Sequence, residues 1–159
     1  MSRVIRPLTA EDVDAVMALA EKISEAPQWK KHEYERCVDE AGLSAVRRVG
    51  FVAETYGSLV GFSVGKLVAD ICELESIVMA PKARGQGIGR TLIGAVEEWA
   101  QAHGANRIEL EVRASNIRAI RFYEHGGMHR EGLRPAYYQS PEEDAVLMGK
   151  SFEDGGKLP

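Results

Sequence analysis

The chain is poor in cysteine and in long apolar runs, and each absence removes a class of protein. Its two cysteines, Cys37 and Cys72, lie far apart and form no CxxC pair, so we expect two thiols in a reducing compartment rather than a disulfide framework. No apolar run approaches the roughly 18 residues of a membrane span, and the first residues contain no apolar signal region. We therefore expect a cytoplasmic protein without a membrane partner.

The chain also has no excess of positive charge and no histidine pattern typical of a metal site. The 159 residues carry a formal net charge of -4 and contain no run of lysine or arginine, which argues against a nucleic-acid partner. The four histidines show no metal-ligand spacing. His103 and His125 fall at expected helix ends, where the helix dipole alone favours histidine. We therefore predict no nucleic-acid partner and no metal.

Hydrophobic periodicity and turn residues divide the chain into alternating strands and helices. The expected strands lie at 3–9, 45–55, 58–70, 71–80, 106–114, 128–135 and 144–150, and the expected helices at 13–23, 29–38, 88–103 and 117–126. We expect Pro27 to end the first helix, Gly42 to close the second, and 136–143 to form a loop. This order predicts an α/β (α+β) domain at 1–150, with a mixed, mostly antiparallel sheet between helices, and a flexible tail at 151–159.

A glycine-rich stretch, "KARGQGIGRTL", precedes the third helix. The dinucleotide fingerprint fails here because its third glycine would fall on an arginine or a leucine, and the P-loop fails because no Gly-Lys pair follows. The spacing that fits is Arg84-x-x-Gly87-x-Gly89 at a helix start. Free N–H groups and the helix dipole make such a turn a phosphate site. A flexible turn without a ligand is the alternative, and two flanking arginines favour the anion.

The strand at 106–114 carries two carboxylates on one face. Ile108, Leu110 and Val112 alternate with Glu109 and Glu111, so the acidic side chains share the other face of the strand. Strands inside an α/β sheet usually bury both faces. The acidic face therefore meets solvent, a cation or a cleft.

Tyr123 and Asn116 belong to the next expected helix. A tyrosine on an amphipathic helix is most often part of the core, and an asparagine before a helix is most often its N-cap. Taken alone, neither residue predicts catalysis.

The glycine stretch and its surroundings resemble the acetyl-coenzyme A motif of the GCN5-related N-acetyltransferase (GNAT) family. "ESIVMAP", "LEVRASNIRAIRFYEHGGM" and "YYQSPEEDAVLM" extend the resemblance over nearly the whole chain, and they look most like the bacterial ribosomal-protein-alanine N-acetyltransferases. The resemblance implies the GNAT fold, with a central sheet of about seven strands and helices on both faces. The carboxylates of "CELES" and the tail past Lys150 depart from the pattern.

The resemblance implies acetyl-coenzyme A as cosubstrate and assigns a group of residues to it. In the family, the turn binds the pyrophosphate through main-chain N–H groups, the strand before it pairs with the pantetheine arm, and the asparagine contacts the cofactor. A Met79 N–H would polarise the acetyl carbonyl. The matching positions are Ile77, Val78, Met79, Arg84, Gly85, Gln86, Gly87, Ile88, Gly89, Arg90 and Asn116.

Acetyl transfer to an amine also needs a base for the amine and an acid for the leaving thiolate. The resemblance assigns these roles to Glu111 and Tyr123, with direct transfer in a ternary complex. It places Glu75, Tyr137 and Tyr138 near the acceptor, Glu75 as a substrate contact or a second base. The alternatives without a function are that Glu75 is only a surface charge and that the two tyrosines only pack the loop.

The acceptor that the resemblance favours is a protein N-terminal amine, with the N-terminal alanine of ribosomal protein S18 as the usual target. An α-amine, with a pKa near 8, loses its proton more easily than a lysine, with a pKa near 10.4. Acetylation of a small amine or of a lysine side chain is the alternative. A second alternative is a module that binds coenzyme A without catalysis. The presence of both Glu111 and Tyr123 argues against it.

Overall fold

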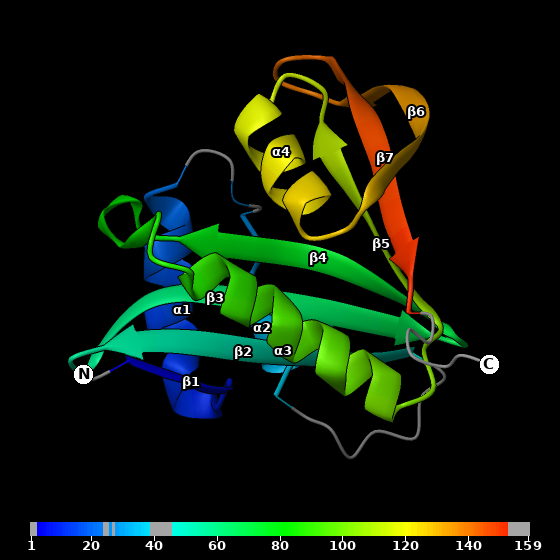
Figure 1. Ribbon diagram of the computed structural model, residues 1–159. Coiled ribbons are helices and arrows are strands. Elements are labelled where there is room, and N and C mark those ends of the chain that lie inside the picture. Colours follow the sequence, from blue (N-terminus) through cyan, green and yellow to red (C-terminus); the bar gives the residue numbers. More distant parts are fainter. Residues whose placement is uncertain (1–2, 24–25, 27, 39–45, 153–159) are drawn as a thin grey trace.

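The computed structural model describes residues 3–23, 26, 28–38 and 46–152. Within these ranges no helix is both long and apolar enough to cross a membrane. Figure 1 shows a single twisted sheet with helices on both faces. The strands are β1 (Arg3–Pro7), β2 (Val46–Thr55), β3 (Ser58–Val68), β4 (Ile71–Met79), β5 (Arg107–Arg113), β6 (His129–Tyr138) and β7 (Glu143–Ser151). The helices are α1 (Val13–Glu21), α2 (Lys31–Glu35), α3 (Ile88–Ala102) and α4 (Ile117–His125), with short 3₁₀ turns η1 (Ala10–Asp12) and η2 (Pro81–Ala83).

The seven strands lie in the order β1-β2-β3-β4-β5-β7-β6. Only the central pair, β4 with β5, is parallel, and every other neighbouring pair is antiparallel. The predicted mixed, mostly antiparallel sheet of about seven strands with helices on both faces is therefore confirmed. The parallel pair needs a crossover connection, which α3 provides.

Two hydrophobic layers hold the helices to the sheet. On one face, Val13 and Val16 of α1 and Tyr34 of α2 pack with Phe62 and Val78. On the other, α3 and α4 share one core with the inward side chains of β4, β5 and β7. Figure 1 shows α3 and α4 in front of the sheet and α1 behind it.

The parallel pair is short, and its two strands then separate. β4 and β5 pair only from Ile71 opposite Arg107 to Glu73 opposite Glu109. Beyond that point β4 continues to Met79 and β5 to Arg113, and Figure 1 shows the two strands diverging, with α4 beside the opening. The second half of β4 therefore has a strand on one side only, which leaves main-chain groups of its other edge without a sheet partner.

Several element boundaries differ from the expected ones. Helix α1 ends at Glu21 and excludes Ile23, and the Gln28 side-chain amide donates to the Ala20 carbonyl at the helix end. Pro27 and Gly42, expected to end the first two helices, lie outside the described residues. The last strand, expected at 144–150, runs from Glu143 to Ser151, and Phe152 after it packs on the core and donates its N–H to the Asn106 carbonyl.

Half of the expected loop at 136–143 is strand, and only 139–142 form a turn. β6 continues through both tyrosines to Tyr138, and β7 begins at Glu143. The pairing of β6 with β7 is irregular between Arg134 and Tyr138, and Ala136 has a φ of 50° there. Pro135 interrupts the strand pattern in the sequence because proline has no N–H to donate, and this is tolerated on an edge strand.

Candidate active site

The turn between β4 and α3 has the backbone that its glycines permit. Gly85 and Gly87 have φ values of 78° and 82°, in the left-handed region that side chains disfavour. Gly87 is the N-cap of α3, and no side chain caps the helix there. The first N–H groups of α3 are therefore available to an anion. The Arg3 guanidinium braces the turn by donating to the Gln86 carbonyl at 2.8 Å.

Three other residues of the turn present mainly their main chain. The Ile88 side chain is fully buried. The Gln86 amide donates to the Lys82 carbonyl. The Arg90 guanidinium donates to the Phe122 carbonyl at 2.7 Å and lies 4.2 Å from the centre of that ring, so it joins α3 to α4.

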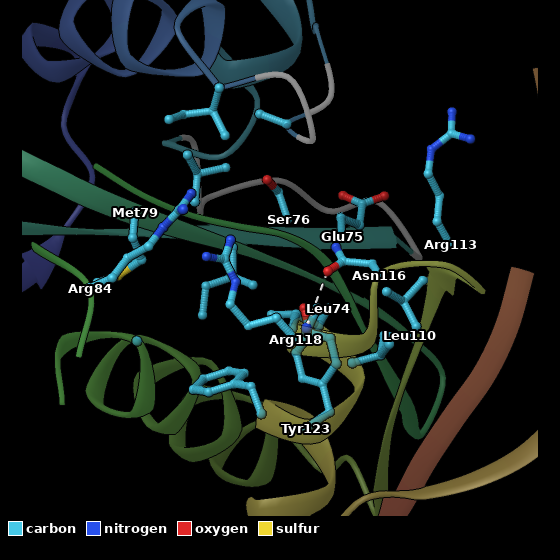
Figure 2. A pocket seen from close by; sticks show the side chains of 18 of the residues that line it. Leu74, Glu75, Ser76, Met79, Arg84, Leu110, Arg113, Asn116, Arg118 and Tyr123 are labelled. Atoms are coloured by element: carbon cyan, nitrogen blue, oxygen red, sulfur yellow. Dashed lines mark hydrogen bonds between the residues drawn. The ribbon is translucent and has the colours of Figure 1, made fainter. Parts of the chain in front are cut away.

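A cavity of about 910 Å³ opens where β4 and β5 diverge. Figure 2 shows side chains of β4, β5 and α4 converging on it. Most of the residues expected to form the site line it, namely Glu75, Ile77, Val78, Met79, Arg84, Gly85, Gly87, Gly89, Arg90, Glu111, Asn116, Tyr123 and Tyr138. Gln86, Ile88 and Tyr137 are not among its lining residues.

Tyr123 reaches this cavity from α4 and is 8% exposed. Burial raises the pKa of its hydroxyl above the ordinary value of 10, because the charged phenolate is poorly solvated there. The phenol therefore stays protonated at neutral pH and can donate a proton. Near it, the Asn116 side-chain oxygen accepts from the Ala119 N–H at 3.2 Å and caps α4, as expected, which leaves the amide NH₂ free of that bond.

Glu111 approaches the cavity from β5. Its carboxylate lies 2.8 Å from the Arg134 guanidinium of β6, and its side chain is 18% exposed. A hydrogen bond to this carboxylate raises the pKa of the Tyr137 hydroxyl. Glu111 is thus held by two residues of the edge strand.

The second tyrosine of β6 faces the cavity. The Arg113 guanidinium lies 4.4 Å from the centre of the Tyr138 ring, and burial raises the pKa of Tyr138 to about 12. Arg113 is itself fixed by Glu143 at 3.1 Å and by the Gln139 and Pro141 carbonyls. The turn between β6 and β7 is therefore tied to the end of β5.

Glu75 lines the cavity from β4 and is engaged by two cations. Arg48 of β2 contacts both of its carboxylate oxygens, at 2.9 and 3.4 Å, and Lys66 lies 3.8 Å away. The side chain is 13% exposed. This pairing fixes the position of the carboxylate in the wall of the cavity.

Some lining residues were not anticipated from the sequence, namely Ile23, Ala26, Leu74, Ser76, Leu110, Val112, Arg113, Arg118, Ala119 and Phe122. Spacing could have found part of this set. Ala119 lies three residues after Asn116 and four before Tyr123, so it shares a helix face with both, and Phe122 lies three residues after Ala119. Ser76 could not be found in this way, because an irregularity in β4 decides its direction.

Among the described residues, no group of three or more histidine, cysteine, aspartate or glutamate side chains could hold a metal ion.

Comparisons with known proteins agree with this arrangement. Residues 14–128 match the model of the acetyltransferase (GNAT) family. The ribosomal protein bS18-alanine N-acetyltransferase of Escherichia coli K12 is 28% identical over 146 residues, which cover 91% of this chain and 94% of that protein.

Two solved structures show the same fold. The crystal structure of the ribosomal-protein-S18-alanine N-acetyltransferase from Escherichia coli matches with a TM-score of 0.79 at 27% identity, covering 94% of this chain and 93% of that one. Chaetomium thermophilum Naa20, in complex with a bisubstrate analogue, matches with a TM-score of 0.79 at 26% identity, covering 93% and 86%. The chain therefore belongs to the acetyltransferase (GNAT) family and is an N-acetyltransferase.

Proposed function

We propose that this enzyme transfers the acetyl group of acetyl-coenzyme A to the N-terminal α-amine of a protein, with a ribosomal protein of the S18 type as acceptor. The names of the relatives support this acceptor class, since the Escherichia coli protein is named for S18 alanine. The observation that carries the proposal is the cavity between β4 and β5. It brings Glu111 of β5, Tyr123 of α4 and the glycine turn together from separate parts of the chain.

The turn and the free edge of β4 fit acetyl-coenzyme A. An added Cβ at Gly85 would meet no atom within 4 Å, so the turn has open space in front of its main chain. Its N–H groups would hold the pyrophosphate. Ile77, Val78 and Met79 pair with β3 on one side only, and their other edge would bind the extended pantetheine arm by main-chain hydrogen bonds.

Acetyl-coenzyme A supplies an activated acetyl thioester, and two side chains would move the protons. The Glu111 carboxylate would accept a proton from the acceptor amine, directly or through water. The Tyr123 hydroxyl would donate a proton to the sulfur that leaves, since burial keeps it protonated. A thiolate whose ordinary pKa is about 8.5 is basic enough to receive it.

Direct transfer is supported by the state of the two cysteines. Cys37 and Cys72 are both buried, and burial raises the pKa of each thiol to about 12. A thiol that stays protonated is a poor nucleophile. We therefore infer that neither forms an acetyl-enzyme and that the amine attacks the thioester itself.

The acceptor class can be tested with two peptides of one sequence, each starting with alanine and containing one internal lysine. One has a free N-terminus and the other is N-formylated. Mass spectrometry after incubation with acetyl-coenzyme A locates the acetyl group. We expect acetylation of the free N-terminus and none of the blocked peptide.

Other outcomes would replace the proposal. Equal acetylation of lysine in both peptides would identify a lysine acetyltransferase, and turnover of polyamines alone would identify a small-amine enzyme. Saturable binding of the cofactor without turnover of any acceptor would identify a binding module.

A further inference from the structure

Ser76 presents an unused hydroxyl to the cavity. The residue is 6% exposed, and its Oγ has no hydrogen-bond partner among the residues that the structure describes. Buried hydroxyl groups in native proteins are nearly always paired. Because Ser76 also lines the cavity, a bound molecule is a natural source of the missing partner.

An irregularity in β4 decides where this hydroxyl lies. In the register with β3, Ser76 is opposite Val64 and Leu74 is opposite Gly65, so Glu75 is an extra residue. Leu74 belongs to the core under α3 and α4, whereas Val78 belongs to the core under α1. Ser76, two residues before Val78, therefore shares the α1 face.

The position of Ser76 separates it from the proposed acid. Figure 2 shows Ser76 on the opposite side of the cavity from Tyr123, with Asn116 between them. Ile23 and Ala26, from the segment after α1, also line the cavity, and both are nearly fully buried. The wall around Ser76 therefore contains two apolar side chains and one unpaired hydroxyl, next to the Glu75 carboxylate that Arg48 engages.

We propose that Ser76 recognises the first side chain of the acceptor peptide, and that serine is the preferred first residue. This inference rests on the proposed N-terminal acetylation. The hydroxyl of an acceptor serine would exchange a hydrogen bond with Ser76 Oγ, and its small size suits a wall formed by Ile23 and Ala26. A peptide that starts with alanine remains an acceptor. Its methyl group would exclude water from Ser76 Oγ but could not form the hydrogen bond that this water provides.

The size of this preference follows from the chemistry of buried polar groups. A site that hydrogen-bonds a substrate hydroxyl discriminates against the analogue without it, because its own polar group is left unpaired. The expected ratio of kcat/KM for serine over alanine is at least about fivefold.

The test compares two peptides that differ only in residue 1, serine or alanine, with the full-length enzyme and saturating acetyl-coenzyme A. The wild-type enzyme should favour the serine peptide. Ser76→Ala should lower kcat/KM for the serine peptide, keep or raise it for the alanine peptide, because no hydroxyl of the enzyme is then left unpaired, and so abolish the preference for serine. The cofactor affinity should stay almost unchanged. The wild-type ratio is informative even if the variant folds poorly.

Ser63→Ala is the matched control. Ser63 is a fully buried serine on the neighbouring strand, its Oγ donates to the Leu92 carbonyl at 3.1 Å, and it does not line the cavity. It should keep the wild-type ratio. A wild-type enzyme that turns over alanine as well as serine, or a ratio unaffected by Ser76→Ala, would overturn this inference alone. If neither peptide is acetylated, the proposed function fails with it.

Discussion

Arg134 Nη2 lies 2.8 Å from Glu111 Oε2, and the two residues belong to β6 and β5, which are separated in the sheet by β7. The Arg134 side chain is 54% exposed while that of Glu111 is 18% exposed. Arg134 of the edge strand β6 thus extends past β7 and provides the positive charge next to the partly buried Glu111 carboxylate. The pair adds little to stability at such exposure, but it fixes the direction of the carboxylate at the cavity.

Glu111→Gln is expected to lower kcat by about 100-fold or more, because general-base catalysis contributes roughly 10² to 10⁴ in rate. The amide keeps the shape of the side chain but cannot accept the proton. The affinity for acetyl-coenzyme A should stay almost unchanged. Thiol release from acetyl-coenzyme A in the presence of peptide gives kcat, and calorimetry gives the affinity.

Glu109→Gln provides the comparison on the same strand face. Glu109 pairs with Arg107 at 2.9 Å and does not line the cavity. Its loss should leave kcat almost unchanged. If both variants lose activity equally, the effect belongs to the strand and not to the carboxylate. If Glu111→Gln keeps full activity, Glu75 or water is the base.

Tyr123→Phe is expected to slow turnover by about 100-fold, because the proton for the leaving sulfur is removed. Since only one oxygen is lost from a buried ring, the cofactor affinity should change little. Kinetics with a thioester whose thiol is more acidic provides the sharper measurement, because such a leaving group needs less protonation. The variant should recover much of its rate with that substrate, and an unchanged deficit would argue against the acid role.

Tyr34→Phe is the control for Tyr123→Phe, because it removes a buried tyrosine hydroxyl that does not line the cavity. Tyr34 is fully buried under α1, and its hydroxyl has no hydrogen-bond partner among the described residues. Removing an unpaired buried hydroxyl should raise the free energy of unfolding by about 1 kcal/mol and leave kcat unchanged. Urea unfolding measures this gain. A loss of stability would mean that the hydroxyl has a partner such as a bound water.

Gly87→Ala tests the glycine turn. At a φ of 82°, an alanine should cost about 1–2 kcal/mol of stability and displace the main chain of the turn. Because this main chain is proposed to hold the pyrophosphate, we expect a weaker affinity for acetyl-coenzyme A, measured by calorimetry. Gly94→Ala is the control, since Gly94 lies inside α3 and an added Cβ would meet no atom within 4 Å. It should raise stability by about 0.5–1 kcal/mol without changing the affinity.

The sequence predicted those parts of the site that follow from local pattern. The alternation of β5 placed Glu111 opposite its buried neighbours, and the glycine spacing located the turn before α3. Burial alternates along β5 in the structure, and Gly87 is the N-cap of α3 with a positive φ. The period of a strand and the demands of a positive φ are local properties, so neighbouring residues suffice to read them.

The remaining parts depend on contacts between distant segments. Arg48 and Glu75 are 27 residues apart, and Arg134 reaches Glu111 across a third strand. No periodicity encodes such pairs. The extra residue in β4 likewise reverses the alternation that a regular strand would give, so the direction of Ser76 required the register between β3 and β4.

Asp12→Asn should make the stability less dependent on pH. The Asp12 carboxylate accepts two bonds from Arg6, at 2.7 and 2.9 Å, and this pairing lowers the pKa of Asp12 from 3.8 to about 2. As the pH falls, Asp12 is therefore protonated in the unfolded chain at a higher pH than in the folded protein. The stabilisation, about 2 kcal/mol, is present above pH 4 and is lost as the pH falls through 2.

Urea unfolding of both proteins at pH 7 and pH 3 provides the measurement. Asp12→Asn should be less stable than the wild type by about 2 kcal/mol at pH 7 and by roughly half as much at pH 3. Other carboxylates titrate in both proteins, so the difference between the two isolates Asp12. Because Asp12 also accepts from the Thr9 N–H at 2.8 Å, which an asparagine oxygen can replace, a difference that stays constant with pH would assign the loss to packing and not to the charge.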